Sequence, residues 1–311
     1  MPEPSVNLPD YPSGTVIHNH PEWKYRAAPG LSSTALKCFA NQSPRHYQYH
    51  FLGDPQPRTP SDAMVLGSLV HCMVLEPDKV KDRYLHDSEG MMRTLDDFKQ
   101  YCREQGLAVT GKRDELMQRV LEHDPQAPVF DVICQNTHKT LVKQSIWEAA
   151  ERMCDSVRHC RDAQLLLSHG DAEVSVWRED EDTGLLCKCR ADLLRNDRIV
   201  VDLKTAACAS PAGFARAIAQ HGYDLQDQHY CNVLDTDLML FIVVESEPPY
   251  LCQVYELDDY SRSVTYRRYR HCLDQMAECI ENKAWPGYSD MAETLSLPGW
   301  YLKQYQYGDV A

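Results

Sequence analysis

The sequence predicts an α/β fold with a mixed central sheet flanked by helices. Three observations support this prediction. Segments of strand character and segments of helical periodicity alternate between residues 172 and 282. Of the 311 residues, 43% are hydrophobic and 25% charged, which is typical of a globular chain and not of a disordered or fibrous one. No run of about 18 apolar residues occurs, so no membrane span is expected.

The first third of the chain divides at its prolines. Residues 1–30 carry six prolines and no apolar period, so we expect an extended arm. Ser32 and Ser33 can cap a first helix over residues 34–39. After a proline-rich connector, Ser61 and Asp62 can cap the apolar run 63–75, which Pro77 ends. That run should form a helix buried on most of its circumference, with Gly67 and His71 on one face.

The rest of the chain carries one insertion and then the sheet. Residues 91–124 have two short helical stretches around a glycine turn, which predicts a small helical insertion. The main domain then spans residues 31–290, and residues 291–311 form a C-terminal tail. The expected strands are 172–177, 185–194, 198–205, 238–244 and 250–256, and the expected later helices are 211–220, 222–230 and 260–282.

Charge and cysteine content exclude several classes of protein. The chain has 32 Lys and Arg against 46 Asp and Glu, a net charge of -14, which counts against non-specific coating of nucleic acid. Its 13 cysteines are odd in number and never form a CxxC pair, so we expect reduced thiols and neither a disulfide framework nor a zinc ribbon. The first residues lack a basic and apolar leader, so a cytoplasmic location is expected.

Residues 190–205 carry the pattern with the strongest chemical content. If they fold as a hairpin centred on Asn196-Asp197-Arg198, Asp192 faces Asp202 and Arg190 faces Lys204. The period of a strand places Lys204 on the same face as Asp202 and turns Ile199, Val201 and Leu203 to the opposite, buried face. Two carboxylates opposite each other destabilise a sheet, and a divalent cation would remove the conflict.

Two aspartates offer the hard oxygen ligands that suit Mg²⁺ or Mn²⁺. A lysine beside them can orient or help deprotonate an attacking water and can neutralise charge on a phosphate. Asp192, Asp202 and Lys204 are therefore the candidate catalytic residues for metal-assisted phosphodiester hydrolysis. A D-x-K motif alone is short and recurs by chance, so the prediction depends on Asp192 and on His71.

Asp192, nine residues, and then Asp202-Leu203-Lys204 resemble the core motif of the PD-(D/E)XK nucleases, in their RecB-like branch. Longer segments resemble the RecE-type exonucleases, including exodeoxyribonuclease VIII, over roughly residues 30–285. The matching segments are Leu31 to Leu36 with Ser43-Pro44, Gly67 to His71 with Leu75-Glu76-Pro77, Glu173 to Ser175, Cys187 to Asp192, Asp202 to Thr205, and Gly222-Tyr223 with Gln226 and Tyr230.

The resemblance implies a role for each matching residue. His71, Asp192, Asp202 and the Leu203 carbonyl would bind metal, with Glu173 as a further acid. Lys204 would be the catalytic lysine. Gln226 and Tyr230 match a Q-x-x-x-Y motif that supports DNA binding and site geometry, although these two residues could equally form one face of an ordinary helix. Further candidate DNA contacts are Arg190, Ser32 and Ser33.

Other basic residues leave alternatives open. The insertion at 91–124 resembles a SAP-like DNA-binding module, with Lys112 and Arg113 as candidate contacts, but Asp114 and Glu115 interrupt its basic helix. The insertion could equally be a spacer or an oligomer contact. The arginines around Tyr266 and Tyr269 could face DNA or simply form a solvated helix face. Some nucleases of this superfamily carry an iron–sulfur cluster, but only Cys272 and Cys279 lie near the C-terminal end, so no cluster is expected.

From the resemblance we expect a Mg²⁺-dependent exonuclease, in which Mn²⁺ can substitute. It would degrade linear double-stranded DNA from 5′ to 3′ and leave a 3′ overhang for a RecT-like annealing protein. A ring-shaped homo-oligomer, trimer or tetramer, encoded by a phage or prophage, is also expected. The alternatives are a structure-specific or single-strand nuclease on the same core, and a catalytically inactive DNA-binding or phage-defence protein. A locally basic channel would reconcile DNA binding with the net charge.

Overall fold

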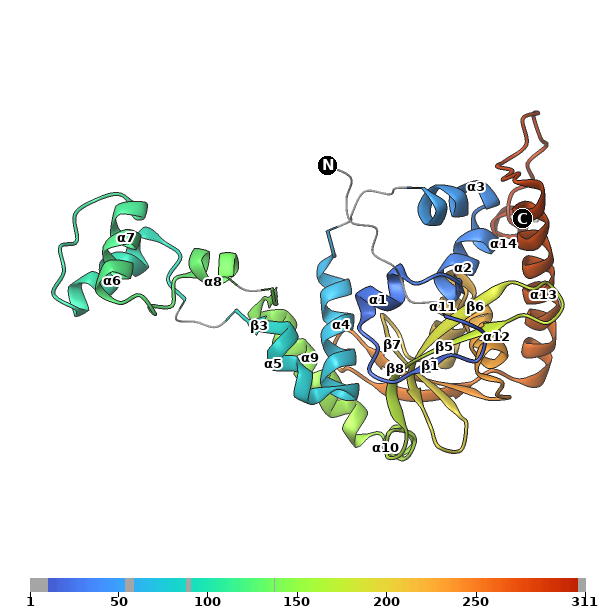
Figure 1. Ribbon diagram of the computed structural model, residues 1–311, viewed down its shortest axis with the longest axis horizontal. Coiled ribbons are helices and arrows are strands. Elements are labelled where there is room, and N and C mark those ends of the chain that lie inside the picture. Colours follow the sequence, from blue (N-terminus) through green and yellow to red (C-terminus); the bar gives the residue numbers. More distant parts are fainter. Residues whose placement is uncertain (1–10, 54–58, 88–90, 137, 307–311) are drawn as a thin grey trace, which may run out of the picture.

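The computed structural model describes residues 11–53, 59–87, 91–136 and 138–306, and its centre is a seven-stranded mixed sheet (Figure 1). The strand order is β1-β5-β6-β7-β8-β9, and β2 pairs with β6. Strand β7 runs parallel to β8, whereas β5 with β6, β6 with β7, and β8 with β9 are antiparallel. The bounds are β1 Val16–Ile17, β2 Leu31–Ser32, β5 Asp171–Glu179, β6 Leu186–Leu194, β7 Val200–Ala206, β8 Met239–Glu245 and β9 Cys252–Glu256.

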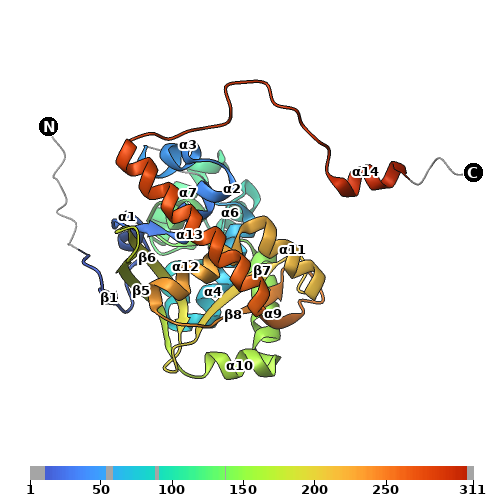
Figure 2. The same ribbon diagram turned by 90° about the vertical axis from the view of Figure 1, so that its right-hand side faces the viewer.

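Helices cover both faces of this sheet, so the predicted α/β fold is confirmed (Figure 2). One core cluster lies between the sheet and α2 Ser33–Asn41, α3 Pro44–Tyr47, α11 Pro211–His221, α12 Tyr223–Leu234 and α13 Asp259–Asn282. The other lies under α4 Asp62–Leu75, α9 Gln144–His159 and α10 Arg161–Leu167. As the strand period predicts, Val201 and Leu203 are buried in this second cluster.

Two features of the predicted sheet and helices are corrected by the structure. The β6–β7 hairpin, which we expected at an edge of the sheet, lies inside it, with β5 and β8 on its two sides. Helix α4 is also less covered than its apolar sequence suggests, because only Leu69, Val70 and Cys72 are buried. Met64 is 60% exposed, since the other side of α4 borders a groove and not a second layer of core.

The N-terminal segment lies on the body, and residues 11–30 carry a short helix within the expected extended arm. Residues 16–17 form β1 against β5, and α1 spans Glu22–Ala27. The ring of Tyr11 stacks on the buried Trp177 with centroids 4.4 Å apart. The ammonium of Lys188 donates to the Tyr25 carbonyl at 2.9 Å and also to that of Ala28, which fixes the end of α1 to β6. The first ten residues lie outside the described part.

The helical insertion has a core of its own and projects from the body (Figure 1). Helix α6 Leu95–Glu104 packs on α7 Arg113–His123 around Phe98, Cys102, Leu116 and Val120, all of which are fully buried. The insertion leaves and rejoins the body at a parallel strand pair, β3 Tyr84–His86 with β4 Thr140–Val142. The remaining elements are a π-helical turn Gln48–Leu52, a 3-10 turn Pro77–Lys79, α5 Val80–Arg83, α8 Phe130–Asn136 and α14 Gly299–Gln306.

None of the helices in the described ranges is both long and apolar enough to cross a membrane. Twelve cysteines in those ranges carry free thiols.

Helix α12 is buried along most of its length, and this gives a pH prediction. His229 has no exposed surface, its Nε2 lies 3.0 Å from the Lys188 carbonyl, and burial lowers its pKa from 6.5 to about 4. Between these values the unfolded chain binds the extra proton, so the free energy of unfolding should fall by up to about 3 kcal/mol as pH drops from 6.5 to 4. Urea unfolding across this pH range should show that the free energy of unfolding falls less in His229→Gln than in wild type.

The exposed His271 on α13 supplies the control, because His271→Gln should leave the acid profile unchanged. A His229→Gln profile as steep as that of wild type would contradict the assignment.

Candidate active site

Three acidic residues face one another across three neighbouring strands. The β6–β7 ladder pairs Leu193 with Val201, so the predicted register is present and Asp192 stands opposite Asp202. The β5–β6 ladder pairs Ala172 with Leu193 and Val174 with Ala191, which places Glu173 opposite Asp192. The paired part of β6 and β7 stops at Leu193 and Val201, so the further pairing predicted for Arg190 and Lys204 does not form.

The acids come together because β5 and β6 both lose their alternation at this point. Ala191 packs in the cluster beneath α12, but Leu193, two residues on, packs in the cluster beneath α4. On β5, Val174 likewise packs in the cluster beneath α12, and Ala172 packs against the cluster beneath α4. Glu173 between them has a φ of +58°, which is unusual for a side chain of this size. Backbone strain of this kind collects at functional sites.

Asp192 connects the hairpin to α4. Its Oδ2 accepts the Leu203 amide N–H at 2.8 Å, in place of the ladder bond that the diverging strands have lost. The same oxygen lies 3.4 Å from His71 Nδ1. The helix-borne histidine and the hairpin acid, both expected to bind metal, therefore lie side by side in the structure.

Asp202 and Lys204 form a buried ion pair. The side chain of Asp202 is 1% exposed and that of Lys204 is 14% exposed, and Lys204 Nζ contacts Asp202 Oδ2. Gln226 Nε2 donates to the other oxygen, Oδ1, at 2.6 Å. Burial raises the pKa of Asp202, against the attraction of Lys204. Burial alone would lower the pKa of Lys204, but the carboxylates of Asp202 and Asp192 raise it above its ordinary value.

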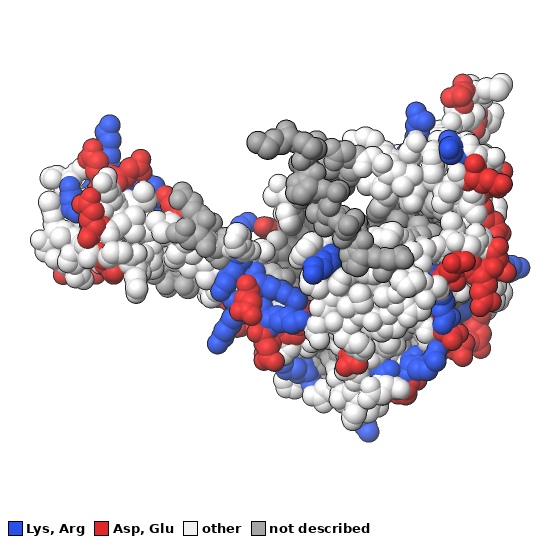
Figure 3. Space-filling view, in the orientation of Figure 1, with Lys and Arg blue, Asp and Glu red and all other residues white. Residues whose placement is uncertain are grey.

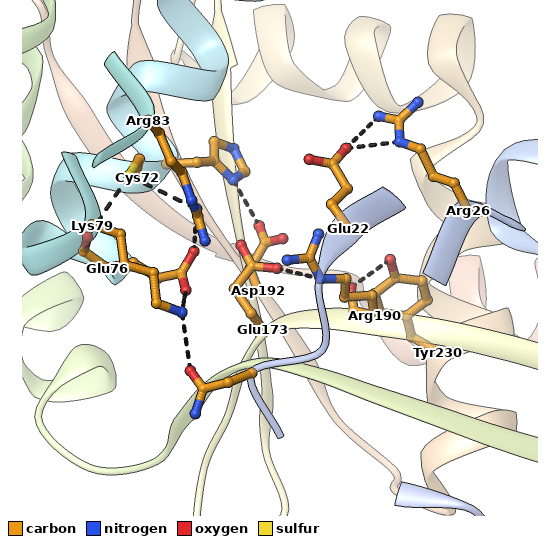
Figure 4. Close-up of polar contacts among 12 residues, drawn as sticks. Glu22, Arg26, Cys72, Glu76, Lys79, Arg83, Glu173, Arg190, Asp192 and Tyr230 are labelled. Atoms are coloured by element: carbon orange, nitrogen blue, oxygen red, sulfur yellow. Dashed lines mark hydrogen bonds and ion pairs between the residues drawn. The ribbon is translucent and has the colours of Figure 1, made fainter. Parts of the chain in front are cut away.

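Glu173 pairs with Arg190. The distance from Arg190 Nε to Glu173 Oε2 is 2.8 Å, and both side chains are 13% exposed. Burial, and then the Asp192 carboxylate, raise the pKa of Glu173 to about 7 despite this arginine. Glu173, Arg190 and Asp192 lie together, with the Glu76–Arg83 pair on the other side of Asp192 (Figure 4). Arg190 thus balances charge within the site, and its contact with DNA stays a prediction.

The Q-x-x-x-Y motif stabilises the geometry of the site from α12. Gln226 and Tyr230 are 5% and 8% exposed. Besides the bond from Gln226 to Asp202, the Tyr230 hydroxyl donates to the Arg190 carbonyl at 3.0 Å. Both polar side chains therefore form hydrogen bonds to the strands of the site. Residues that merely share one face of an ordinary helix would not need these bonds.

A groove with a volume of about 2080 Å³ runs along the site. His71, Glu173, Arg190, Asp192 and Tyr230 line it. Ser32 and Ser33 line it too, and the Ser32 hydroxyl accepts the Ala35 amide N–H as the cap of α2. Four basic residues line the groove: Arg26, Arg83, Lys188 and Arg190. Three acidic residues line it: Glu22, Glu173 and Asp192. The groove therefore lacks the acidic excess of the whole chain.

Acidic side chains gather instead at the edge formed by α13 (Figure 3). The arginines of this helix mostly face the body: Arg262 pairs with Asp227, Arg268 with Asp224 and Arg270 with Asp180. These three arginines therefore form neither a strip that faces DNA nor a solvated helix face.

Of the two candidate DNA contacts of the insertion, Arg113 is engaged locally through its side chain and Lys112 through its backbone. Lys112 is the N-cap of α7, and its amide N–H donates to the Glu115 carboxylate at 3.0 Å. Arg113 donates to the Arg93 carbonyl at 2.7 Å and pairs with Asp131 at 2.7 Å. Contact of Lys112 and Arg113 with DNA stays a prediction.

The donors at the site suit a hard divalent cation. Carboxylate oxygens and one imidazole nitrogen are the ligand types that Mg²⁺ and Mn²⁺ accept. Within the described residues, no three His, Cys, Asp or Glu side chains already form a cluster able to hold an ion. His71 and Asp192 supply an adjacent pair of donors, and the carboxylate of Asp202 is held by Lys204 and Gln226. The residues present fit the cation in type, and the third ligand stays a prediction.

A mixed sheet with two aspartates and a lysine on its central hairpin, and a histidine on a preceding helix, defines the PD-(D/E)XK nuclease class. Residues 32–298 match the family described as a PDDEXK-like domain of unknown function, DUF3799, and the chain belongs to that family. This confirms the predicted class and fold. PD-(D/E)XK nucleases typically use divalent metals.

A solved structure named "putative exonuclease", from Eubacterium rectale, has the same fold. It is similar over 90% of this chain and 94% of its own, with a TM-score of 0.50 and 14% identity. At that identity the likeness concerns the fold alone. The structure of SSO0001 matches over 70% of this chain and 87% of its own, with 15% identity and a TM-score of 0.27. No curated protein matches the chain.

Proposed function

We propose that this protein is a metal-dependent exonuclease that degrades linear double-stranded DNA from 5′ to 3′ and leaves a 3′ overhang. The observation that supports it best is the His71–Asp192 pair, which lines the groove, with the buried Asp202–Lys204 pair on the neighbouring strand behind it. Activity on DNA ends and the direction of cutting rest on the resemblance to RecE-type exonucleases.

Each residue has a defined part in this proposal. His71, Asp192 and Asp202, with the Leu203 carbonyl and Glu173, would hold Mg²⁺, for which Mn²⁺ can substitute. When bound, the cation polarises the scissile phosphate and lowers the pKa of a coordinated water. Because the neighbouring carboxylates raise the pKa of Lys204, its ammonium is protonated at neutral pH. In this proposal Lys204 would orient the attacking water and neutralise charge on the phosphate.

The assembly and partners are proposed on the same resemblance. A ring-shaped homo-oligomer, trimer or tetramer, would confine DNA to a path along the groove, whose lining is more basic than the α13 edge. The 3′ overhang would pass to a RecT-like annealing protein in the host cytoplasm, from a phage or prophage gene.

Linear, nicked and covalently closed duplexes, incubated with Mg²⁺ and with a chelator, test the proposal. We expect loss of linear DNA with Mg²⁺, intact closed circles, and no cleavage with the chelator. A label on either the 5′ or the 3′ end reports the direction. Equal degradation of closed circles would contradict an exonuclease, preference for single strands or branched duplexes would favour another nuclease activity, and no degradation would favour an inactive DNA-binding protein.

A further inference from the structure

A second lysine lies behind the catalytic pair, on α2. The ammonium of Lys37 donates to Gln226 Oε1 at 3.3 Å, and Gln226 Nε2 in turn donates to Asp202 Oδ1 at 2.6 Å. A chain of hydrogen bonds thus runs from α2 through α12 to the metal-binding aspartate of β7. No pattern in the sequence distinguishes Lys37 from a surface lysine.

The chemistry of this chain allows one orientation of the Gln226 amide. An ammonium group has only donors, and an ionised carboxylate has only acceptors. An amide between them must turn its oxygen to Lys37 and its NH₂ to Asp202. Without Lys37, the amide can rotate and present its oxygen to the Asp202 carboxylate, which is repulsive.

The backbone makes room for this lysine. Gly222, between α11 and α12, has a φ of +66°, and a Cβ there would lie 3.1 Å from Lys37 Cγ. The ring of Tyr223 lies within cation–π distance of both lysines, with its centroid 5.3 Å from Lys37 Nζ and 4.7 Å from Lys204 Nζ. Burial, and then Lys204, lower the pKa of Lys37 to about 8, so the donor is still protonated at neutral pH.

We infer that Lys37 is a positioning residue, which orients Gln226 and through it the Asp202 carboxylate for metal binding and cleavage. This inference rests on the proposed function. It differs from a DNA contact, because the lysine acts on the enzyme's own carboxylate.

Lys37→Met tests the inference by removing the donor while keeping most of the side-chain volume. We expect a loss of about 10- to 100-fold in kcat and in the affinity for Mn²⁺ measured by calorimetry, with little change in KM for DNA. Lys37→Arg, which keeps a donor, should recover part of both. Lys99→Met on α6 is the matched control, because Lys99 pairs with the exposed Asp96, at 4.0 Å, on the projecting insertion.

A mutant cycle with Gln226→Met shows whether Lys37 acts through the amide. The double variant should lose no more Mn²⁺ affinity or kcat than Gln226→Met alone, and additive losses would overturn the inference. A raised KM and a reduced salt dependence, with kcat unchanged, would also overturn it in favour of a phosphate contact. The Mn²⁺ arm needs no substrate, so if wild-type protein cleaves no DNA, the proposed function fails while Lys37 is still tested.

Discussion

Neutralising either member of the Asp202–Lys204 pair should destabilise the protein more than neutralising both. Asp202→Asn leaves the Lys204 ammonium without its partner, and Lys204→Met leaves a carboxylate that is only 1% exposed. Removing one partner of a buried pair typically lowers the free energy of unfolding by about 3–5 kcal/mol, whereas an uncharged pair of similar volume is often tolerated. The double variant should therefore regain most of the lost stability and remain inactive.

Urea unfolding without divalent cation, alongside nuclease assays with Mg²⁺, measures both effects. The control is the surface pair Arg158–Asp155, whose side chains are 62% and 61% exposed, and Arg158→Met should hardly change stability. A double variant no more stable than the less stable single variant would show that the two charges do not compensate each other. Recovered cleavage in the double variant would remove both residues from the catalytic machinery.

The hairpin was predictable because its information is local. The alternation of Val201 and Leu203 with Asp202, and a polar turn, fix the register that sets Asp192 opposite Asp202. Its place inside the sheet was not predictable in this way. That place depends on β8, which is separated from β7 by two helices and pairs with it in parallel. Local sequence carries no signal for such a pairing.

Helix α4 shows the limit of apolar patterning. Its residues are apolar on most of the circumference, which predicts burial on most of it. In the structure one side packs on the core and the other borders the groove, where Met64 stays exposed. A helix face that borders a groove can be as apolar as a face that packs on a second layer of core. The sequence therefore does not distinguish the two.

The parts of the site that sequence missed depend on three-dimensional neighbours. Glu173 takes a left-handed backbone, although it lies within a strand. Lys37 reaches Gln226 past Gly222, where a Cβ would lie 3.1 Å from Lys37 Cγ. Arg190 pairs with Glu173, a contact that its motif did not predict. Motif matching identified most of the residues, and packing decides which atoms they contact.

Two substitutions of Asp192 should separate its effect on stability from its effect on catalysis, because we propose that its carboxylate contributes to both. Asp192→Ala leaves the Leu203 amide N–H without an acceptor, so we expect a loss of about 1–3 kcal/mol in the free energy of unfolding. Asp192→Asn keeps an oxygen for that bond and should be nearly as stable as wild type. Both variants lose the charge of the carboxylate that we propose as a metal ligand, and if this removes about 4 kcal/mol of transition-state stabilisation, kcat falls about a thousandfold.

The exposed acid Asp197, in the turn of the same hairpin, supplies the control, because it pairs with Arg195 away from the groove. Asp197→Ala should keep its nuclease activity. Equal destabilisation by alanine and asparagine at position 192 would show that the bond to Leu203 does not hold the strands. Full activity in Asp192→Asn would show instead that metal binding does not need the negative charge of Asp192. Asp202 would then supply the charged carboxylate by itself.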